Sequence, residues 1–163
     1  MVEIDNVDRG ILYELQRNAR DTTAQEIADK TGVSASTVRN RIDRLEEVGV
    51  IEGYYPKINY EAAGLPLQAL FVCTADPAER SNLVDQLLGV RGVIEIRETL
   101  TGSQNLFVEV VADDTGDMAR ISDAIHALGL SVESSEILRQ RRVQPFDHFH
   151  FDPPSSPDGS NRE

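Results

Sequence analysis

Apolar residues recur every three to four positions before residue 50, and this pattern predicts three short helices. The predicted buried faces contain, in chain order, Ile11, Leu12 and Leu15; Ala24, Ile27 and Ala28; and Val38, Ile42 and Leu45. Asp8, Thr23 and Ser34 stand where N-caps are expected, and Thr23 has the capping-box spacing to Glu26. The second and third helices are each followed by a glycine.

The order of these helices is that of a helix-turn-helix. A short helix, a turn at Gly32-Val33 and a longer helix form this motif, and the longer helix enters the major groove of DNA with its N-terminal half. Residues 50–59 then predict two short strands around Gly53, which would form a wing carrying the basic Lys57.

The solvent side of the third helix carries side chains that suit DNA recognition: Ser36, Thr37, Arg39, Asn40, Arg41 and Arg44. Arginine can read guanine, asparagine can read adenine, and hydroxyl groups can bond bases or phosphates. Arg41 borders the buried face, so contact with a base, contact with a phosphate and bracing of the fold all stay open. Alternatively, the arginines form surface pairs with the acidic residues one turn away. The order of helix, turn, helix and ribbon favours DNA binding.

From Pro66 onward the pattern is strand, helix, strand, strand, helix, strand. The six segments are residues 65–75, 77–88, 93–99, 105–111, 115–128 and 131–138. The helices are expected to turn inward Leu83, Val84, Leu87 and Leu88, and Met118, Ile121, Ile125 and Leu128. This order is the ferredoxin-like βαββαβ arrangement. Helices on one face leave the other face of the sheet open, so a homodimer with two recognition helices is expected.

Residues 7–64, VDRGILYELQRNARDTTAQEIADKTGVSASTVRNRIDRLEEVGVIEGYYPKINYEAAG, resemble the Lrp/AsnC family of bacterial and archaeal transcription regulators. The match is most specific from Thr37 through Ile51, and the resemblance extends from residue 3 to about residue 144. It implies a sequence-specific DNA-binding regulator that acts as a dimer or higher oligomer, with no enzymatic activity and no cofactor. It also implies that Ser34, Ser36, Thr37, Asn40, Arg41 and Arg44 face DNA. To these we add Thr23, Arg39 and Lys57.

The turn between the second and third strands of the βαββαβ region is a candidate effector site. In many relatives this turn reads Thr-Gly-x-Tyr-Asp and lies beside an amino-acid site between subunits. The equivalent residues here are Thr101, Gly102, Ser103, Gln104 and Asn105. Gln-Asn in place of Tyr-Asp removes a partner for a ligand ammonium group, so a plain polar hairpin loop is the alternative to an amino-acid-like effector site.

The charge of the chain is unusual for a DNA-binding protein. The net charge is −12, but residues 1–60 carry only −3 of it, with eleven acidic and eight basic side chains. Two lysines against fourteen arginines, on an acidic chain, resemble proteins of halophiles that live with molar internal salt. The single cysteine, Cys73, excludes an intrachain disulfide and is expected to be buried. Without a signal peptide or membrane span, a cytoplasmic protein is expected.

The fold class is therefore predicted as α+β: a winged helix-turn-helix over residues 1–60, a ferredoxin-like domain over 61–144, and an arm with a disordered tail over 145–163. Asp147, His148, His150 and Asp152 could ligate a metal, but an arm that packs Phe146, Phe149 and Phe151 is favoured, so no metal site is predicted. The alternative function is a sirohaem-type tetrapyrrole decarboxylase of the same two-domain plan. Its His-Asn-Tyr-Glu-Arg-like segment and its tryptophan are absent from this sequence.

Overall fold

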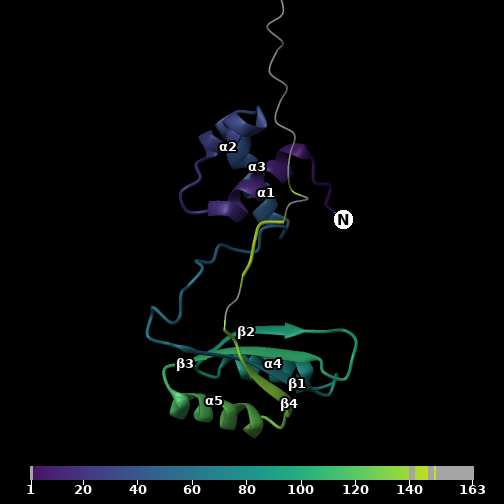
Figure 1. Cartoon of the computed structure of the whole chain (residues 1–163). Coiled ribbons are helices and arrows are strands. Elements are labelled where there is room, and N and C mark those ends of the chain that lie inside the picture. The colour runs from purple at the N-terminus through teal and green to yellow at the C-terminus, as the bar shows by residue number, and fades with distance from the viewer. Residues whose placement is uncertain (1, 140–141, 147–148, 150–163) are drawn as a thin grey trace, which may run out of the picture. The chain divides into compact units, whose positions relative to one another are not determined.

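The computed structural model describes residues 2–139, 142–146 and 149. These residues divide into two compact units (Figure 1). The first unit contains residues 2–56 together with 142–146 and 149, and the second contains residues 57–139. None of the helices in these ranges is both long and apolar enough to cross a membrane.

The first unit is built from three helices, α1 (Asn6–Asn18), α2 (Ala24–Thr31) and α3 (Ala35–Glu47). Their apolar faces meet in one core, whose buried members are Ile11, Leu12, Ile27, Ala28, Val38 and Leu45. Thr23 and Ser34 cap α2 and α3 through their side chains, as the sequence predicts. Gly32 ends α2 with φ 73°, a left-handed conformation that glycine adopts without strain. The helix-turn-helix is therefore confirmed.

The start of α1 differs from the expectation. Asp5, not Asp8, is the N-cap: the Asp5 carboxylate accepts a bond from the Asp8 backbone N–H at 2.9 Å, and the Asp8 carboxylate accepts one from Asp5 N–H at 3.3 Å. Either aspartate could cap a helix by its own preference. The three-residue spacing decides in favour of Asp5, because only then do both carboxylates satisfy free N–H groups.

The predicted wing strands do not form in this structure. The part of the chain between α3 and residue 67, all of which is described, contains no strand. Instead, the backbone N–H groups of Val50 and Ile51 both donate to Leu45 O, at 2.9 and 3.0 Å, and close the end of α3. Pro56 has no N–H to donate, and an isolated two-stranded ribbon is marginal in water.

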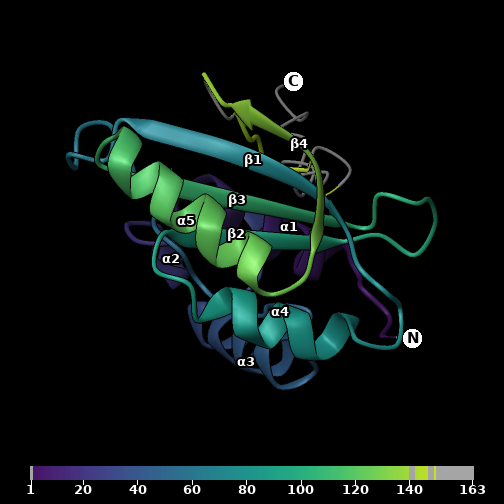
Figure 2. The ribbon, with the colours of Figure 1, turned by 90° about the horizontal axis from the view of Figure 1, so that it is seen from below.

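The second unit contains a four-stranded antiparallel sheet and two helices. In chain order these elements are β1 (Leu67–Thr74), α4 (Arg80–Leu88), β2 (Val93–Glu98), β3 (Leu106–Ala112), α5 (Thr115–Ala127) and β4 (Ser131–Ile137). The strand order is β2-β3-β1-β4, which is that of the ferredoxin-like arrangement. Helices α4 and α5 lie on the same face of the sheet (Figure 2). The predicted order of elements is confirmed.

The core of the second unit lies between the sheet and its two helices. β1 and β3 pair with Phe71 opposite Val108 and Ala69 opposite Val110, and all four side chains turn toward α4 and α5. Cys73 belongs to this core and is fully buried, as expected; burial, with Glu133 nearby, raises the pKa of its thiol to about 11. The expectation for Leu88 is wrong. Leu87 and Leu88 stand about 100° apart on the helix, so Leu87 enters the core while Leu88 stays 60% exposed.

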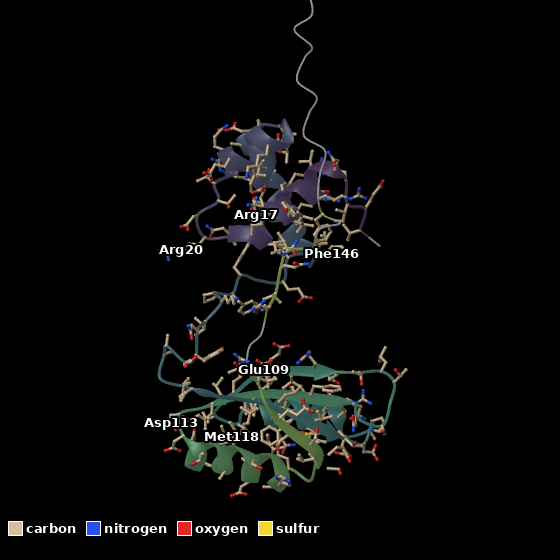
Figure 3. All side chains as sticks on the ribbon, in the orientation of Figure 1. Arg17, Arg20, Glu109, Asp113, Met118 and Phe146 are labelled. Atoms are coloured by element: carbon tan, nitrogen blue, oxygen red, sulfur yellow. The ribbon has the colours of Figure 1, made fainter. Side chains whose placement is uncertain are left out.

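The C-terminal segment returns to the first unit. Phe149 packs against the core of the three helices, and the ring of Phe146 meets the ring of Phe149 edge-on at 5.1 Å. The backbone N–H of Phe146, labelled in Figure 3, donates to Gln16 Oε1 of α1 at 3.1 Å. These contacts agree with an arm, and the arm over residues 145–163 stays a prediction. The candidate metal ligands Asp147, His148, His150 and Asp152, and Phe151, lie outside the described residues.

Candidate nucleic-acid interface

The hydroxyl groups at the start of α3 form one connected cluster. Ser34 Oγ accepts the backbone N–H of Thr37 at 3.1 Å, and it lies 2.9 Å from Ser36 Oγ and 2.8 Å from Thr37 Oγ1. The cap thus fixes the first turn of the helix and holds three hydroxyl groups together. Hydroxyl groups at a helix N-terminus are suited to contact phosphates or bases.

Arg39 and Asn40 stand free on the exposed side of α3. Both side chains are exposed, as is Ser36, and neither the Arg39 nor the Asn40 side chain makes a hydrogen bond or ion pair with any described residue. On the opposite side of the same helix, Val38 and Leu45 are fully buried. The helix therefore presents to solvent an arginine, which can bond guanine bidentately, and an asparagine, which can bond adenine bidentately.

Arg41 and Arg44 are engaged within the first unit. Arg41 Nη1 lies 2.8 Å from Asp5 Oδ2 and 3.2 Å from Asp8 Oδ1. Arg44 Nη1 lies 3.3 Å from Asp8 Oδ2, and its Nη2 donates to Glu3 O at 3.3 Å. The sequence left three roles open for Arg41: contact with a base, contact with a phosphate, or stabilisation of the fold. These contacts correspond to stabilisation of the fold, and the contacts of Arg44 do so too.

The ion pair between Asp5 and Arg41 favours the ionised form of both side chains. Partial burial alone would raise the pKa of Asp5, but bonds from the Asp8 backbone and from Arg41 lower it below its ordinary value of 3.8. The bond to Asp5 in turn raises the pKa of Arg41, against the opposing effect of burial. Asp8 is fully buried between the two guanidinium groups.

Thr23 and Lys57, the other two predicted DNA contacts, lie outside α3. Thr23 uses its hydroxyl in the capping box of α2, where it accepts Glu26 N–H at 3.2 Å. The Glu26 carboxylate in turn accepts bonds from the backbone N–H and the hydroxyl of Thr23. These bonds, of which the backbone bond has the larger effect, lower the pKa of Glu26. Lys57 is exposed but belongs to the second unit, so its DNA contact stays a prediction.

Two residues that sequence reasoning missed bond side chains of α3. Asp5 is one, and the Asp-x-x-Asp spacing of a capping box was the signal for it. Tyr54 is the other: its hydroxyl donates to Glu46 Oε1 of α3 at 2.7 Å, which ties the chain that follows α3 back to it. Burial, and then the bond to Glu46, raise the pKa of Tyr54 to about 12.

In the candidate effector turn, Asn105 has a structural task. Its buried amide donates to Ala75 O at 2.8 Å and accepts Ala75 N–H at 2.9 Å, and its backbone N–H donates to Cys73 O. A ligand that used this amide would have to displace both side-chain bonds. Thr101, Gly102, Ser103 and Gln104 are exposed. Arg80, which sequence reasoning missed, donates to Thr99 O at 3.1 Å and holds the base of the turn.

The described ranges contain no group of three His, Cys, Asp or Glu side chains that could hold a metal ion. The groups that α3 exposes are hydroxyl, amide and guanidinium groups.

Comparison with known proteins gives the relationship. A family model described as winged helix-turn-helix DNA-binding matches residues 4–52. The HTH-type transcriptional regulator AldR of Mycobacterium tuberculosis is 35% identical over 119 residues, 71% of this chain and 65% of AldR's own length. An uncharacterised HTH-type transcriptional regulator of Pyrococcus horikoshii is 34% identical over 73% of this chain and 74% of that protein.

Solved structures agree. The feast or famine regulatory protein of M. tuberculosis, complexed with L-methionine, is 26% identical, with a TM-score of 0.76, covering 87% of this chain and 96% of that chain. Escherichia coli AsnC shares the fold, with a TM-score of 0.69. This chain belongs to the Lrp/AsnC family of HTH-type transcriptional regulators. In this Lrp/AsnC regulator, α2 and α3 both lie within residues 4–52, which the DNA-binding model matches.

Proposed function

We propose that this chain regulates transcription by recognising a specific DNA sequence with the N-terminal half of α3. The observation that carries the proposal is the exposed row Ser36, Arg39 and Asn40, in which the side chains of Arg39 and Asn40 make no hydrogen bond or ion pair with any described residue. Val38 and Leu45, on the other side of the helix, hold that row in place. Residues 1–60 would supply DNA binding, and residues 61–144 assembly and effector binding.

A triple substitution tests this proposal. The parent and the variant Ser36→Ala, Arg39→Ala, Asn40→Ala would be compared on an operator selected from random duplexes, by fluorescence anisotropy at fixed salt. Two lost bidentate contacts, each about 1–3 kcal/mol, predict at least a roughly thirtyfold loss of affinity. Arg20→Ala is the matched control, because the Arg20 side chain is 93% exposed outside α3. Equal binding by the triple variant and the parent would contradict the assignment of α3.

An amino-acid-like effector is proposed for the second unit. The proposal is supported by the L-methionine complex of the related feast or famine protein and by the exposed side chains of Thr101, Ser103 and Gln104. Isothermal titration with L-methionine is expected to give saturable binding that Gln104→Ala weakens. No heat above dilution with L-methionine or any other amino acid would leave the turn as a plain hairpin loop.

A homodimer is proposed as the DNA-binding form. The face of the sheet away from α4 and α5 carries Leu70 and Phe107, which are half-buried and lie outside the core between the sheet and its helices, beside Val72 and Val111, which are already buried in the single chain. Pairing two such faces would bury apolar surface and supply two copies of α3 for a two-fold related site. The tetrapyrrole decarboxylase is not favoured, because the relatives are named as transcriptional regulators. Cytoplasmic location and adaptation to molar salt stay predictions.

A further inference from the structure

Three arginines lie on α3, and only one of them is free to meet DNA. Arg41 and Arg44 pair with Asp5 and Asp8 from the start of α1, whereas Arg39 has no acidic partner among the described residues. Every lysine or arginine that reaches a phosphate adds affinity without regard to sequence. The pairing of Arg41 and Arg44 with the two aspartates therefore affects how strongly the interface prefers one DNA sequence over another.

The two aspartates have different roles in this pairing. Asp8 is fully buried, and a buried carboxylate needs compensating charge, which Arg41 and Arg44 both supply. Asp5 is 48% exposed and already caps α1 with Oδ1. Its second oxygen, Oδ2, is bonded to Arg41 Nη1 at 2.8 Å. Neither the cap nor the burial of Asp8 requires this second bond.

The bond between Asp5 and Arg41 lies at the surface. The Arg41 side chain is 32% exposed, so the guanidinium is in reach of solvent while it holds the carboxylate. A carboxylate oxygen and a phosphate oxygen bond a guanidinium in the same way. Asp5, together with Asp8, thus occupies Arg41 Nη1, a donor that a DNA phosphate could otherwise take.

We propose that Asp5 is a specificity-determining residue, which withholds Arg41 from duplex phosphates so that base contacts by Arg39 and Asn40 dominate binding. This inference rests on the proposed recognition of DNA by α3. Its consequence is a low affinity for duplexes of unrelated sequence.

The test is Asp5→Asn in the full chain. Asparagine keeps the capping oxygen and removes one of the two carboxylate charges that hold Arg41, so that only the bonds to Asp8 remain. Affinities for the operator and for a scrambled duplex would be measured across a series of salt concentrations. The expected result is tighter binding of the scrambled duplex, a smaller ratio of operator to scrambled affinity, and a salt slope steeper by about 0.9 for each protomer that gains a phosphate contact.

Two further variants make the result specific. Asp21→Asn changes the net charge equally in the same unit, but Asp21 pairs with Arg20 and not with α3, so it should leave the slope unchanged. Adding Arg41→Met to Asp5→Asn should restore the parental slope. A thermal melt of each variant verifies that the helices remain folded, and Asp5→Ser provides a second cap-preserving variant.

Three results would overturn the inference. The first is a salt slope that is unchanged in both folded Asp5 variants, and the second is an equal change of slope in Asp21→Asn. The third is a slope for Arg41→Met alone that is shallower than that of the parent, which would mean that Arg41 already contacts a phosphate in the parent. Failure of the α3 assignment itself is read separately, from the triple alanine variant on the operator.

Discussion

At the scale of single residues, polar side chains hold together segments that are distant in the chain. Asp8 bonds arginines 33 and 36 positions away, and the Asn105 amide bonds both backbone groups of Ala75, 30 positions away. Each of these side chains is buried, so each bond replaces water that folding removed. Such residues are costly to change because of their place in the fold alone.

Asn105 gives a prediction at this scale. Asn105→Ala leaves the N–H and C=O of Ala75 unsatisfied in a buried position, which costs about 1–3 kcal/mol for such a group. We expect a lower urea midpoint for the second unit, measured by circular dichroism. Gln104→Ala, in the exposed neighbour, is the control and should leave the midpoint unchanged. A stable Asn105→Ala variant would return Asn105 to the candidate ligand contacts.

At the scale of elements, the described C-terminal residues 142–146 and 149 belong to the same compact unit as the helix-turn-helix. Gln16 joins the two: its Nε2 donates to Leu12 O of its own helix at 3.2 Å, and its Oε1 accepts Phe146 N–H. Both ends of the amide are therefore used. Phe149 adds apolar contact with the core of the three helices.

Removing that contact should loosen the first unit. Phe149 is only partly buried, so Phe149→Ala should cost about 1–2 kcal/mol, less than the roughly 3–5 kcal/mol of a fully buried phenylalanine. Hydrogen exchange of the backbone amides in α1 should become faster, as measured by mass spectrometry. Val143→Ala, in a side chain that is 65% exposed on the same segment, should change little. Unchanged exchange in Phe149→Ala would show that the segment adds no stability.

At the scale of the whole molecule, the question is how two helix-turn-helix units come together. Two-fold related operators need two copies of α3, and a single chain supplies one. The sheet face opposite α4 and α5 carries Phe107, cross-strand from Val72. This face is the proposed contact between two copies.

Phe107→Asp should dissociate the dimer, because it places a charge in an apolar contact. Sedimentation velocity should shift toward the monomer, and affinity for a two-fold operator should fall more than affinity for a half-site. Leu88→Asp is the control, since Leu88 is 60% exposed on α4, on the covered side of the sheet. If Phe107→Asp remains a folded dimer while Leu88→Asp dissociates, the contact lies on the helical side.

The sequence by itself determined the elements, their order and the family. Helical periodicity and the caps at Thr23 and Ser34 depend on residues that lie within about four positions of one another. Each element of the βαββαβ order is recognised from the same kind of local pattern, so all of these features can be read directly from the chain. The predictions that failed were also local: the cap at Asp8, the wing strands and the inward Leu88. The reasons were local too: the capping-box spacing of Asp5 and Asp8, the missing N–H of Pro56, and the angle of about 100° between Leu87 and Leu88 on the helix.

The tertiary structure alone decided which side chains remain available to DNA. Helical angle placed Arg39, Arg41 and Arg44 on or beside one exposed face, but only the fold brings Asp5 and Asp8 against two of them. It likewise assigned the Asn105 amide to Ala75 and returned Phe149 to the first unit. The physical reason is the same in all three: these partners are 30 or more positions apart, and no pattern of local propensity specifies such a pair.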